Sequence, residues 1–265
     1  MTSLIKDNDR TLTVFGSTCF IGRHLFKTLL GDKTEPEVVG YHSRNANLLD
    51  EGIVDRLRRE LTAKDTLLIL SANTLQTGAT MNEFRTNMTM ITNLCDLITV
   101  VRPEKVIYFS TQAIFGEDTN HEDIKETTEP VPSSIYGLSK LTSERLLDHV
   151  IKALTTTLVV LRIPRVYGPE DSVSNYGPSQ FLHLSGQKKR IGLWGDGLEL
   201  RHFLFVEDLI NAVIEILNKP KLEGVFNPTR RISRIWAEME GGGGNKATAG
   251  NVTSARSMSR DWQLL

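Results

Sequence analysis

The sequence predicts an α/β fold built on a doubly wound parallel sheet, and two observations carry that prediction. From about residue 11 to residue 168, short apolar runs typical of buried strands alternate with longer segments of helical periodicity. Such alternation indicates a parallel sheet with helices on both faces. Beyond residue 170 the pattern becomes irregular, which predicts a small C-terminal lobe beside the sheet.

The expected elements follow one another along the chain. Strands are predicted at residues 12–16, 37–43, 65–70, 105–110 and 156–163. Helices are predicted at residues 23–30, 81–101, 134–154 and, in the lobe, 206–217. Pro103 ends the second helix, because proline lacks the backbone donor that a helix interior needs. Ser133 or Ser134 caps the start of the third helix.

This pattern divides the chain into three parts. Residues 11–170 form the parallel-sheet domain, and residues 171–228 form segments of the lobe with a returning helix. The remaining residues, 229–265, include "GGGGNKATAGNVTSARS", which is small, polar and without periodicity. This composition predicts a low-complexity, poorly ordered tail and therefore a truncated lobe.

Composition and charge exclude several classes of function. A chain of 265 residues, 40% hydrophobic and 24% charged, is ordinary for a soluble globular protein. The formal net charge of −1 gives no support for a nucleic-acid-binding or membrane-surface role. No apolar run reaches the roughly 18 residues of a membrane span, and the six histidines lack the spacing of metal ligands. Two cysteines, Cys19 and Cys95, and an N-terminus without an apolar leader predict a cytoplasmic protein.

The stretch "TVFGSTCFIGRHL" at residues 13–25 reads as a strand, a glycine turn and a helix. Such a turn brings backbone N–H groups and the positive end of a helix against a pyrophosphate. Gly16 and Gly22 supply two glycines, but Cys19 stands between them where a third is expected. Taken alone, the pattern fits a tight turn without a ligand as well as it fits a dinucleotide site.

Two further features carry chemistry. Tyr136 and Lys140 are four residues apart on the third predicted helix, so both side chains lie on one face. A lysine cation near a phenol lowers the phenol pKa, and such a tyrosine can exchange a proton with a substrate hydroxyl. Ser110 and Thr111 lie at the end of a buried strand, at the sheet edge where open α/β sheets bind ligands. The alternative for Tyr136 and Lys140 is a pair on the protein surface, and the alternative for Ser110 and Thr111 is a simple helix or turn cap.

The order of these features, through correctly spaced strand–helix units, resembles the extended short-chain dehydrogenase/reductase family. More narrowly, the chain is similar to the NAD-dependent epimerase/dehydratase branch, whose members act on nucleotide sugars. The stretches "LRIPRVYGPE" and "GDGLELRHFLFVEDL" are similar to two further motifs of that branch, and the resemblance covers residues 11 to about 228. It implies a Rossmann-like NAD(P)-binding domain at 11–170, a nucleotide-sugar substrate and a homodimer.

The resemblance also implies roles for individual residues. Tyr136 is the expected acid/base, Lys140 its activator and ribose contact, and Thr111 the group that polarises the substrate oxygen. Cofactor contacts are expected at Gly16, Thr18, Cys19, Phe20, Ile21, Gly22, Ser43, Arg44, Asn47, Leu48, Ser71, Ala72, Tyr136 and Lys140. Substrate contacts are expected at Asn87, Gln112, Arg165 and Arg201. The planar fork of Arg201 suits diphosphate oxygens, and an interhelix hydrogen bond is the alternative for Asn87.

Some positions depart from the family pattern. Gln112 and Ala113 stand where the 4,6-dehydratases of the family carry an acidic pair, and neither side chain can act as a general acid or base. A 4,6-dehydratase is therefore rejected. Arg165 replaces the usual asparagine of its motif, which alters the substrate pocket and leaves the identity of the sugar open. His202 replaces the usual aspartate after Arg201, a smaller departure.

The end of the second predicted strand bears on the choice of cofactor. NAD enzymes place a carboxylate there for the ribose hydroxyls, whereas this chain has Tyr41, His42, Ser43 and Arg44. An arginine and a hydroxyl suit a 2′-phosphate, so the cofactor is NAD or NADP, with NADP favoured. An exposed loop charge is the alternative for Arg44.

We therefore expect an NAD(P)-dependent nucleotide-sugar epimerase or 4-keto-sugar reductase, since the same catalytic residues serve both reactions. The hydride passes between the nicotinamide and a sugar carbon, and the tyrosine handles the proton. The alternative is a noncatalytic member of the family that binds the dinucleotide without turnover. The intact Thr111, Tyr136 and Lys140 argue against that alternative, whereas a lost sugar lobe after "GVFNP" favours it.

Overall fold

A computed structural model describes residues 11–30, 36–74, 80–116, 124–171, 179–180, 184, 186–187, 189, 200–228 and 234–235. At its centre lies a six-stranded sheet in which every neighbouring pair of strands is parallel. Its strands are β1 (Thr11–Phe15), β2 (Glu37–Tyr41), β3 (Thr66–Ile69), β4 (Lys105–Thr111), β5 (Thr157–Ile163) and β9 (Gly224–Phe226). The parallel α/β fold predicted from the alternating pattern is confirmed.

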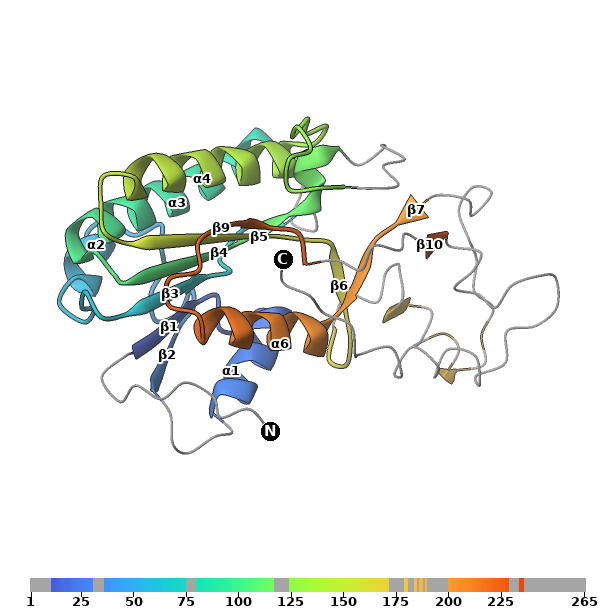
Figure 1. The fold of residues 1–265 in the computed structure, drawn as a ribbon, viewed down its shortest axis with the longest axis horizontal. Helices are drawn as coiled ribbons and strands as arrows, with labels where there is room; N and C mark the ends of the chain where they lie inside the picture. Colours follow the sequence, from blue (N-terminus) through green and yellow to red (C-terminus); the bar gives the residue numbers. More distant parts are fainter. Residues whose placement is uncertain are drawn as a thin grey trace.

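Helices cover both faces of this sheet (Figure 1). One face carries α2 (Ile53–Leu57), α3 (Met81–Val101) and α4 (Ile135–Ile151), and the other carries α1 (Phe20–Leu30) and α6 (Val206–Leu217). Side chains alternate along β4, so Val106 and Tyr108 join the core on the α3 and α4 side, whereas Ile107 and Phe109 join the opposite core. A strand buried on both faces therefore reads as one continuous apolar run.

The order of the strands places the ligand-binding edge. The sheet runs β2-β1-β3-β4-β5-β9, so the chain leaves β1 for one side and then returns to the other side to form β3. Open α/β sheets bind ligands outside the carboxyl ends of the strands at such a reversal. Gly16 follows β1 and Ser71 follows β3, and a Cβ built at Gly16 would lie only 3.0 Å from the Ser71 nitrogen. The glycine turn therefore lies at the reversal point.

The ends of the long helices follow their local sequence. Helices α3 and α6 have the predicted bounds, and α3 ends with Arg102 in the left-handed region, at a φ of 53°, directly before Pro103. Ser134 caps α4, because its hydroxyl accepts a hydrogen bond from the Gly137 nitrogen at 3.1 Å. Helix α1 begins at Phe20, three residues before the predicted start, since Cys19 precedes it as a cap.

The lobe contributes short strand pairs beyond the carboxyl edge of the sheet. Strand β6 (Arg165–Tyr167) pairs in parallel with β8 (Phe203–Phe205), and β7 (Leu200–Arg201) pairs antiparallel with β10 (Arg234–Ile235). Such short strands leave no periodicity in a sequence, which is why none was predicted. Apart from β10, the expected tail at 229–265 lies outside the described residues. Among the helices that the structure describes, none has both the length and the apolar character needed to cross a membrane.

Candidate active site

The glycine turn is built by close backbone contacts. Gly16 has a φ of +92°, which glycine adopts without strain. A Cβ at Gly22 would lie 2.3 Å from the Gly16 carbonyl oxygen, so α1 approaches the end of β1 only because residue 22 lacks a side chain. The Gly16 and Ser17 nitrogens both donate to the Tyr41 oxygen, at 2.8 and 3.1 Å. The turn is thus fixed between the end of β2 and the start of α1.

Cys19 occupies the cap position of α1 in this turn. Its nitrogen donates to the Gly16 oxygen at 3.0 Å, and its thiol accepts the Gly22 N–H with an N–Sγ distance of 3.3 Å. Among the described non-glycine residues only Arg102 and Glu170 have a positive φ, so a glycine at residue 19 is not needed for the backbone. Desolvation raises the pKa of the Cys19 thiol, although the Gly22 N–H and the charge of Arg23 oppose that rise.

Thr111 ends β4 and begins a short turn of 3₁₀ helix, η2 (Gln112–Phe115). Its hydroxyl accepts a hydrogen bond from the Ala113 nitrogen at 3.2 Å. The start of α4 packs directly on this turn, because a Cβ at Gly137 would lie 2.4 Å from the Ala113 oxygen. Tyr136, the residue before Gly137, is therefore held beside the turn that follows Thr111.

Lys140 lies one turn further along α4 and is buried, with 4% of its surface exposed. Its Nζ donates to the Phe109 oxygen at 2.7 Å and lies 4.7 Å from the centre of the Tyr108 ring. Burial lowers the pKa of Lys140 to about 8, while the charge of Glu144 opposes that shift. Burial also raises the pKa of Tyr136 to about 12. The expected lowering of the phenol pKa is absent in this structure, because desolvation raises that pKa, and the ammonium group of Lys140 bonds to β4.

Asn87, on α3, joins three segments of the site. Its side-chain oxygen accepts from the Asn73 nitrogen at 2.8 Å, and its amide nitrogen donates to the Asn73 oxygen at 3.0 Å. The same amide donates to the Ser139 hydroxyl on α4 at 3.2 Å, and Ser139 in turn donates to the Tyr136 carbonyl at 2.8 Å. The interhelix hydrogen bond offered as the alternative for Asn87 is therefore present, and it reaches the backbone of Tyr136.

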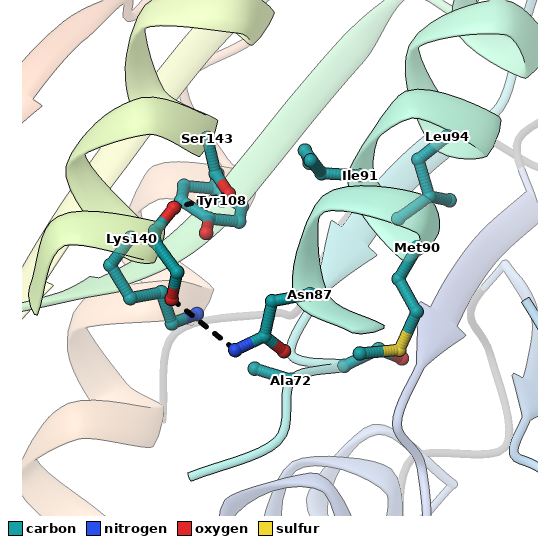
Figure 2. Close-up of a pocket in the computed structure, with 10 residues that line it drawn as sticks. Ala72, Asn87, Met90, Ile91, Leu94, Tyr108, Lys140 and Ser143 are labelled. Carbon is teal, nitrogen blue, oxygen red and sulfur yellow. Dashed lines mark hydrogen bonds between the residues drawn. The ribbon is translucent and has the colours of Figure 1, made fainter. Parts of the chain in front are cut away.

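A small pocket of about 10 Å³ opens between the end of β3, α3 and α4 (Figure 2). It brings together predicted site residues that are far apart in the sequence, namely Ser71, Ala72, Asn87 and Lys140. Sequence reasoning missed the other polar residues of the lining, Tyr108, Ser139 and Ser143. Ser139 and Ser143 are one helical turn apart on α4 and share a face with the Tyr136–Lys140 pair, so helical spacing was the signal that could have found them.

The turn after β2 carries the predicted cofactor-specificity residues. Ser43 and Arg44 are exposed there, and the Arg44 nitrogen donates to His42 Nδ1 at 3.2 Å. Tyr41 bonds instead to the Glu60 carboxylate, so its hydroxyl is turned away from this edge. Further along, Leu48 is buried, and the Asn47 amide bonds to Asp50 at 2.5 Å.

The predicted substrate residues lie on three different segments. Gln112 begins η2, and its Nε2 is buried with no hydrogen-bond partner among the described residues. Because a buried donor without a partner is costly, this amide is available to a bound ligand. Arg165 begins β6 and is half-buried, and Arg201 lies in β7 with its side chain outside the described part of the chain.

The fold and the site define a class of protein. A glycine turn at the reversal point of a parallel sheet, beside a Tyr-x-x-x-Lys helix, is the arrangement that the sequence motifs predicted for a dinucleotide-dependent enzyme. The sequence model of the NAD dependent epimerase/dehydratase family matches residues 12–227, and the chain belongs to this family. The predicted family and the predicted class, an NAD(P)-dependent enzyme of the short-chain dehydrogenase/reductase type, are confirmed.

Curated relatives carry names from the same family. The chain is 26% identical over 243 residues to the uncharacterized UDP-glucose epimerase YtcB of Bacillus subtilis, a match that covers 80% of this chain and 74% of that protein. It is 35% identical over 106 residues to the dTDP-L-rhamnose 4-epimerase of Burkholderia thailandensis, which is 38% of this chain and 29% of that protein.

Solved structures share the fold. A UDP-N-acetylglucosamine 4-epimerase from Methanobrevibacter ruminantium superposes with a TM-score of 0.74 at 22% identity, covering 88% of this chain and 80% of that one. The UDP-glucuronic acid 4-epimerase of Bacillus cereus, in complex with UDP-glucuronic acid and NAD, superposes with a TM-score of 0.72, also at 22% identity, covering 87% and 81%.

Proposed function

We propose that this chain transfers a hydride between a nicotinamide dinucleotide and a carbon of a nucleotide sugar, as an epimerase or a 4-keto-sugar reductase. The observation that carries the proposal is the packing of α4 on the η2 turn, through Gly137 and Ala113, which brings the first turn of α4 against the turn that follows Thr111. The names of the Bacillus and Burkholderia relatives support a sugar nucleotide as the substrate.

The residues at the sheet edge fit a dinucleotide. Side chains at Gly16 or Gly22 would fill the space between the strand ends and α1, so the turn leaves a cradle of bare backbone at a helix N-terminus. Gly16, Thr18, Cys19, Phe20, Ile21 and Gly22 would hold the pyrophosphate, with Ser71, Ala72 and Lys140 further along the same edge. The bound nicotinamide supplies the hydride chemistry, and the protein supplies orientation and proton handling.

Proton transfer is assigned to Tyr136, which is protonated at neutral pH because its pKa lies near 12. In the reductase reaction the phenol donates its proton to the ketone oxygen of the sugar, and Thr111 polarises the same oxygen. In the epimerase reaction Tyr136 must first lose that proton, so that its phenolate can accept the proton of the sugar hydroxyl. The buried Gln112 amide donates a further hydrogen bond to the substrate. No group at residues 112 and 113 can remove a proton for water elimination, which is why we propose no dehydratase activity.

Cofactor choice, assembly and compartment complete the proposal. Exposed Ser43 and Arg44 at the end of β2 favour the 2′-phosphate of NADP, and Asn47 and Leu48 would contact the adenine. A homodimer is proposed from the resemblance to the family, and the exposed apolar residues Met81 and Val100 of α3 offer surface for it. The free thiols of the two cysteines support a cytoplasmic location. Residues 11–170 act as the cofactor domain and 171–228 as the substrate lobe.

Purification of the full chain, followed by release of any bound nucleotide and titration with NADH and NADPH, tests the cofactor. Copurified NAD⁺ supports an epimerase, whereas preferential NADPH binding supports a reductase. UDP-glucose, UDP-N-acetylglucosamine and UDP-glucuronic acid are then incubated with the protein, and the products are followed by NMR. Tyr136→Phe should keep cofactor binding and lower turnover by about 100- to 10,000-fold, while exposed Leu138→Ala on the same helix should change neither. Failure to bind either dinucleotide would refute the proposal.

A further inference from the structure

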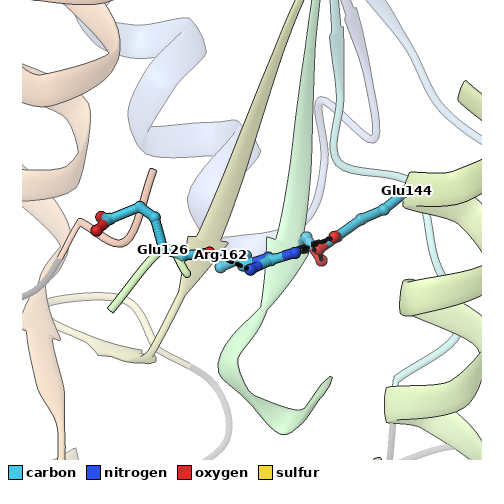
Figure 3. Close-up of polar contacts among 4 residues, drawn as sticks. Glu126, Glu144 and Arg162 are labelled. Atoms are coloured by element: carbon cyan, nitrogen blue, oxygen red, sulfur yellow. Dashed lines mark hydrogen bonds and ion pairs between the residues drawn. The ribbon is translucent and has the colours of Figure 1, made fainter. Parts of the chain in front are cut away.

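A buried ion pair lies next to the candidate site, outside every role assigned above (Figure 3). Arg162, on β5, places Nη2 at 2.9 Å from Glu144 Oε2, and its Nε lies within 3.3 Å of both carboxylate oxygens. Both side chains are 6% exposed. The two residues come from different elements, α4 and β5, so the pair joins the helix of Tyr136 to the sheet.

On one side the pair reaches the strand that ends at Thr111. The Ser110 hydroxyl donates to Glu144 Oε1 at 2.5 Å, and Ser110 is the register partner of Arg162 across β4 and β5. Lys140, one turn before Glu144, donates to the Phe109 oxygen. Helix α4 is therefore attached to two consecutive residues of β4 directly before Thr111.

On the other side the pair reaches the segment at residues 124–130, which leads into α4. Arg162 Nη1 donates to the Glu126 carbonyl at 3.3 Å, and the guanidinium lies 5.3 Å from the centre of the Phe115 ring. The Glu126 carboxylate accepts from the Asn227 nitrogen at 2.9 Å, directly after β9. The guanidinium thus connects α4, the end of η2 and the 124–130 segment, and Glu126 extends this connection to the chain that follows β9.

Stability alone gives little reason for such a pair. Moving two charges out of water costs about as much free energy as their mutual attraction gains. Apolar residues of similar size in the same place are often at least as stabilising. The hydrogen bonds of the pair, by contrast, have directions that an apolar contact lacks. The bonds from Ser110 and to Glu126 therefore fix an arrangement of segments rather than merely fill a space.

We propose that the Glu144–Arg162 pair is a positioning unit, which holds the helix of Tyr136 and Lys140 and the 124–130 segment in one arrangement around Thr111. The consequence for catalysis rests on the proposed function. Glu144 also faces Lys140 as an anion; the other titratable groups about that ammonium are Tyr108 on β4 and Cys19 before α1. The negative charge of Glu144 raises the pKa of Lys140. Without that charge the pKa should fall, so the ammonium should deprotonate at a lower pH.

Three variants of the full chain test the positioning role. Glu144→Gln removes the charge and keeps the shape, but it leaves the Arg162 charge uncompensated and lowers stability. The double variant Glu144→Leu/Arg162→Met replaces the pair by apolar residues of similar length and should recover the midpoint of thermal unfolding. Asp148→Asn is the matched control, because Asp148 lies one turn further along α4 in an exposed pair with Lys152.

Hydrogen exchange and steady-state kinetics are the two readouts. In the double variant we expect faster amide exchange in residues 124–130 and 225–228, NADH binding as in the unmodified protein, and a kcat lowered about 10- to 100-fold with little change in KM. Glu144→Gln should also move the alkaline limb of the kcat profile, which reports Lys140, to lower pH. Asp148→Asn should match the unmodified protein in all of these.

Two results overturn the positioning role: unchanged exchange in both segments of the folded double variant, or a double variant with the kcat and pH profile of Asp148→Asn. An unmodified protein that binds NADH but turns over none of the three UDP-sugars would count against the epimerase form of the proposed function instead. In that case, exchange in residues 124–130 and 225–228 still decides whether the pair positions these segments.

Discussion

Two neighbouring regions of the carboxyl edge are held together in different ways. The glycine turn between β1 and α1 depends on backbone approach, with 2.3 Å between the Gly16 oxygen and a Cβ built at Gly22. The region of β4, α4 and β5 depends on buried polar side chains, including Lys140, Glu144 and Arg162. The first region places the N-terminus of α1 at the sheet edge, where an anion can bind. The second fixes the directions of side chains that act on a substrate.

The two regions therefore tolerate different kinds of substitution. In the glycine turn an added methyl group has no space, whereas we expect exchange of the Cys19 side chain to alter little. In the α4 region the side chains themselves form the connections, so removal of one polar group leaves another without its partner. Four substitutions test this contrast, and they are given in decreasing order of the change that we expect.

Gly22→Ala should have the largest effect. The new Cβ meets the Gly16 backbone oxygen, which cannot move without breaking the turn at the end of β1. The overpacking should lower the free energy of unfolding by about 1–3 kcal/mol and weaken NADH binding, even though alanine favours helices. Denaturant unfolding and NADH fluorescence titration measure the two effects. Lys27→Ala, at an exposed position of α1, is the control, and equal behaviour of the two variants would contradict the close approach.

Gly137→Ala should reduce turnover more than cofactor binding. Its Cβ would lie 2.4 Å from the Ala113 oxygen, so the first turn of α4, with Tyr136, has to move away from the turn after Thr111. A displacement of this kind lowers kcat by about 10- to 100-fold. Steady-state kinetics with the accepted sugar nucleotide gives the value, and Leu138→Ala serves as the neighbour control. A kcat equal to that of Leu138→Ala would show that this packing does not position Tyr136.

Lys140→Met should reveal a dependence of stability on pH. The Lys140 pKa is about 8 in the folded chain, against 10.5 for an ordinary lysine. Between these values the unfolded chain binds a proton that the folded chain has lost, so the free energy of unfolding rises with pH. The stability of the unmodified protein relative to Lys140→Met should therefore increase from pH 8 to pH 10.5. Denaturant unfolding across this range measures it, with the exposed Lys152→Met as control; a constant difference would contradict the burial of the ammonium.

Cys19→Gly should have the smallest effect. The substitution removes the thiol that accepts the Gly22 N–H, and glycine at a helix cap costs roughly a few tenths of a kcal/mol. The freed Gly22 N–H belongs to the first turn of α1, where a pyrophosphate would bind, so NADH affinity should rise or stay the same. Calorimetric titration of NADH into this variant and into Cys19→Ser, which keeps an acceptor, separates the two cases. A marked loss of affinity in Cys19→Gly alone would assign the thiol a role of its own.

Local signals predicted much of the fold. The bounds of α3 and α6, the Ser134 cap and the end of α3 before Pro103 all follow from residues within one or two turns. Strands β1 to β5 of the sheet were predicted from their apolar runs, whereas the three-residue strand β9 of the same sheet was missed. The short strands β6 and β8 were missed, since three-residue strands have no period to detect.

The candidate site divides in the same way. The glycine turn, the Tyr136–Lys140 pair and Thr111 at a strand end could be predicted from the sequence, because each depends on spacing within a single strand–helix unit. Three contacts could be seen only in the tertiary structure. Lys140 bonds to β4, Asn87 reaches the Tyr136 backbone through Ser139, and Glu144 pairs with Arg162. These contacts join residues far apart in the chain, and the pKa values of Tyr136 and Lys140 depend on burial that packing creates. The spacing of residues along the chain shows which side chains share a face of one helix or strand. Desolvation and contacts between distant residues arise only when those faces pack against one another.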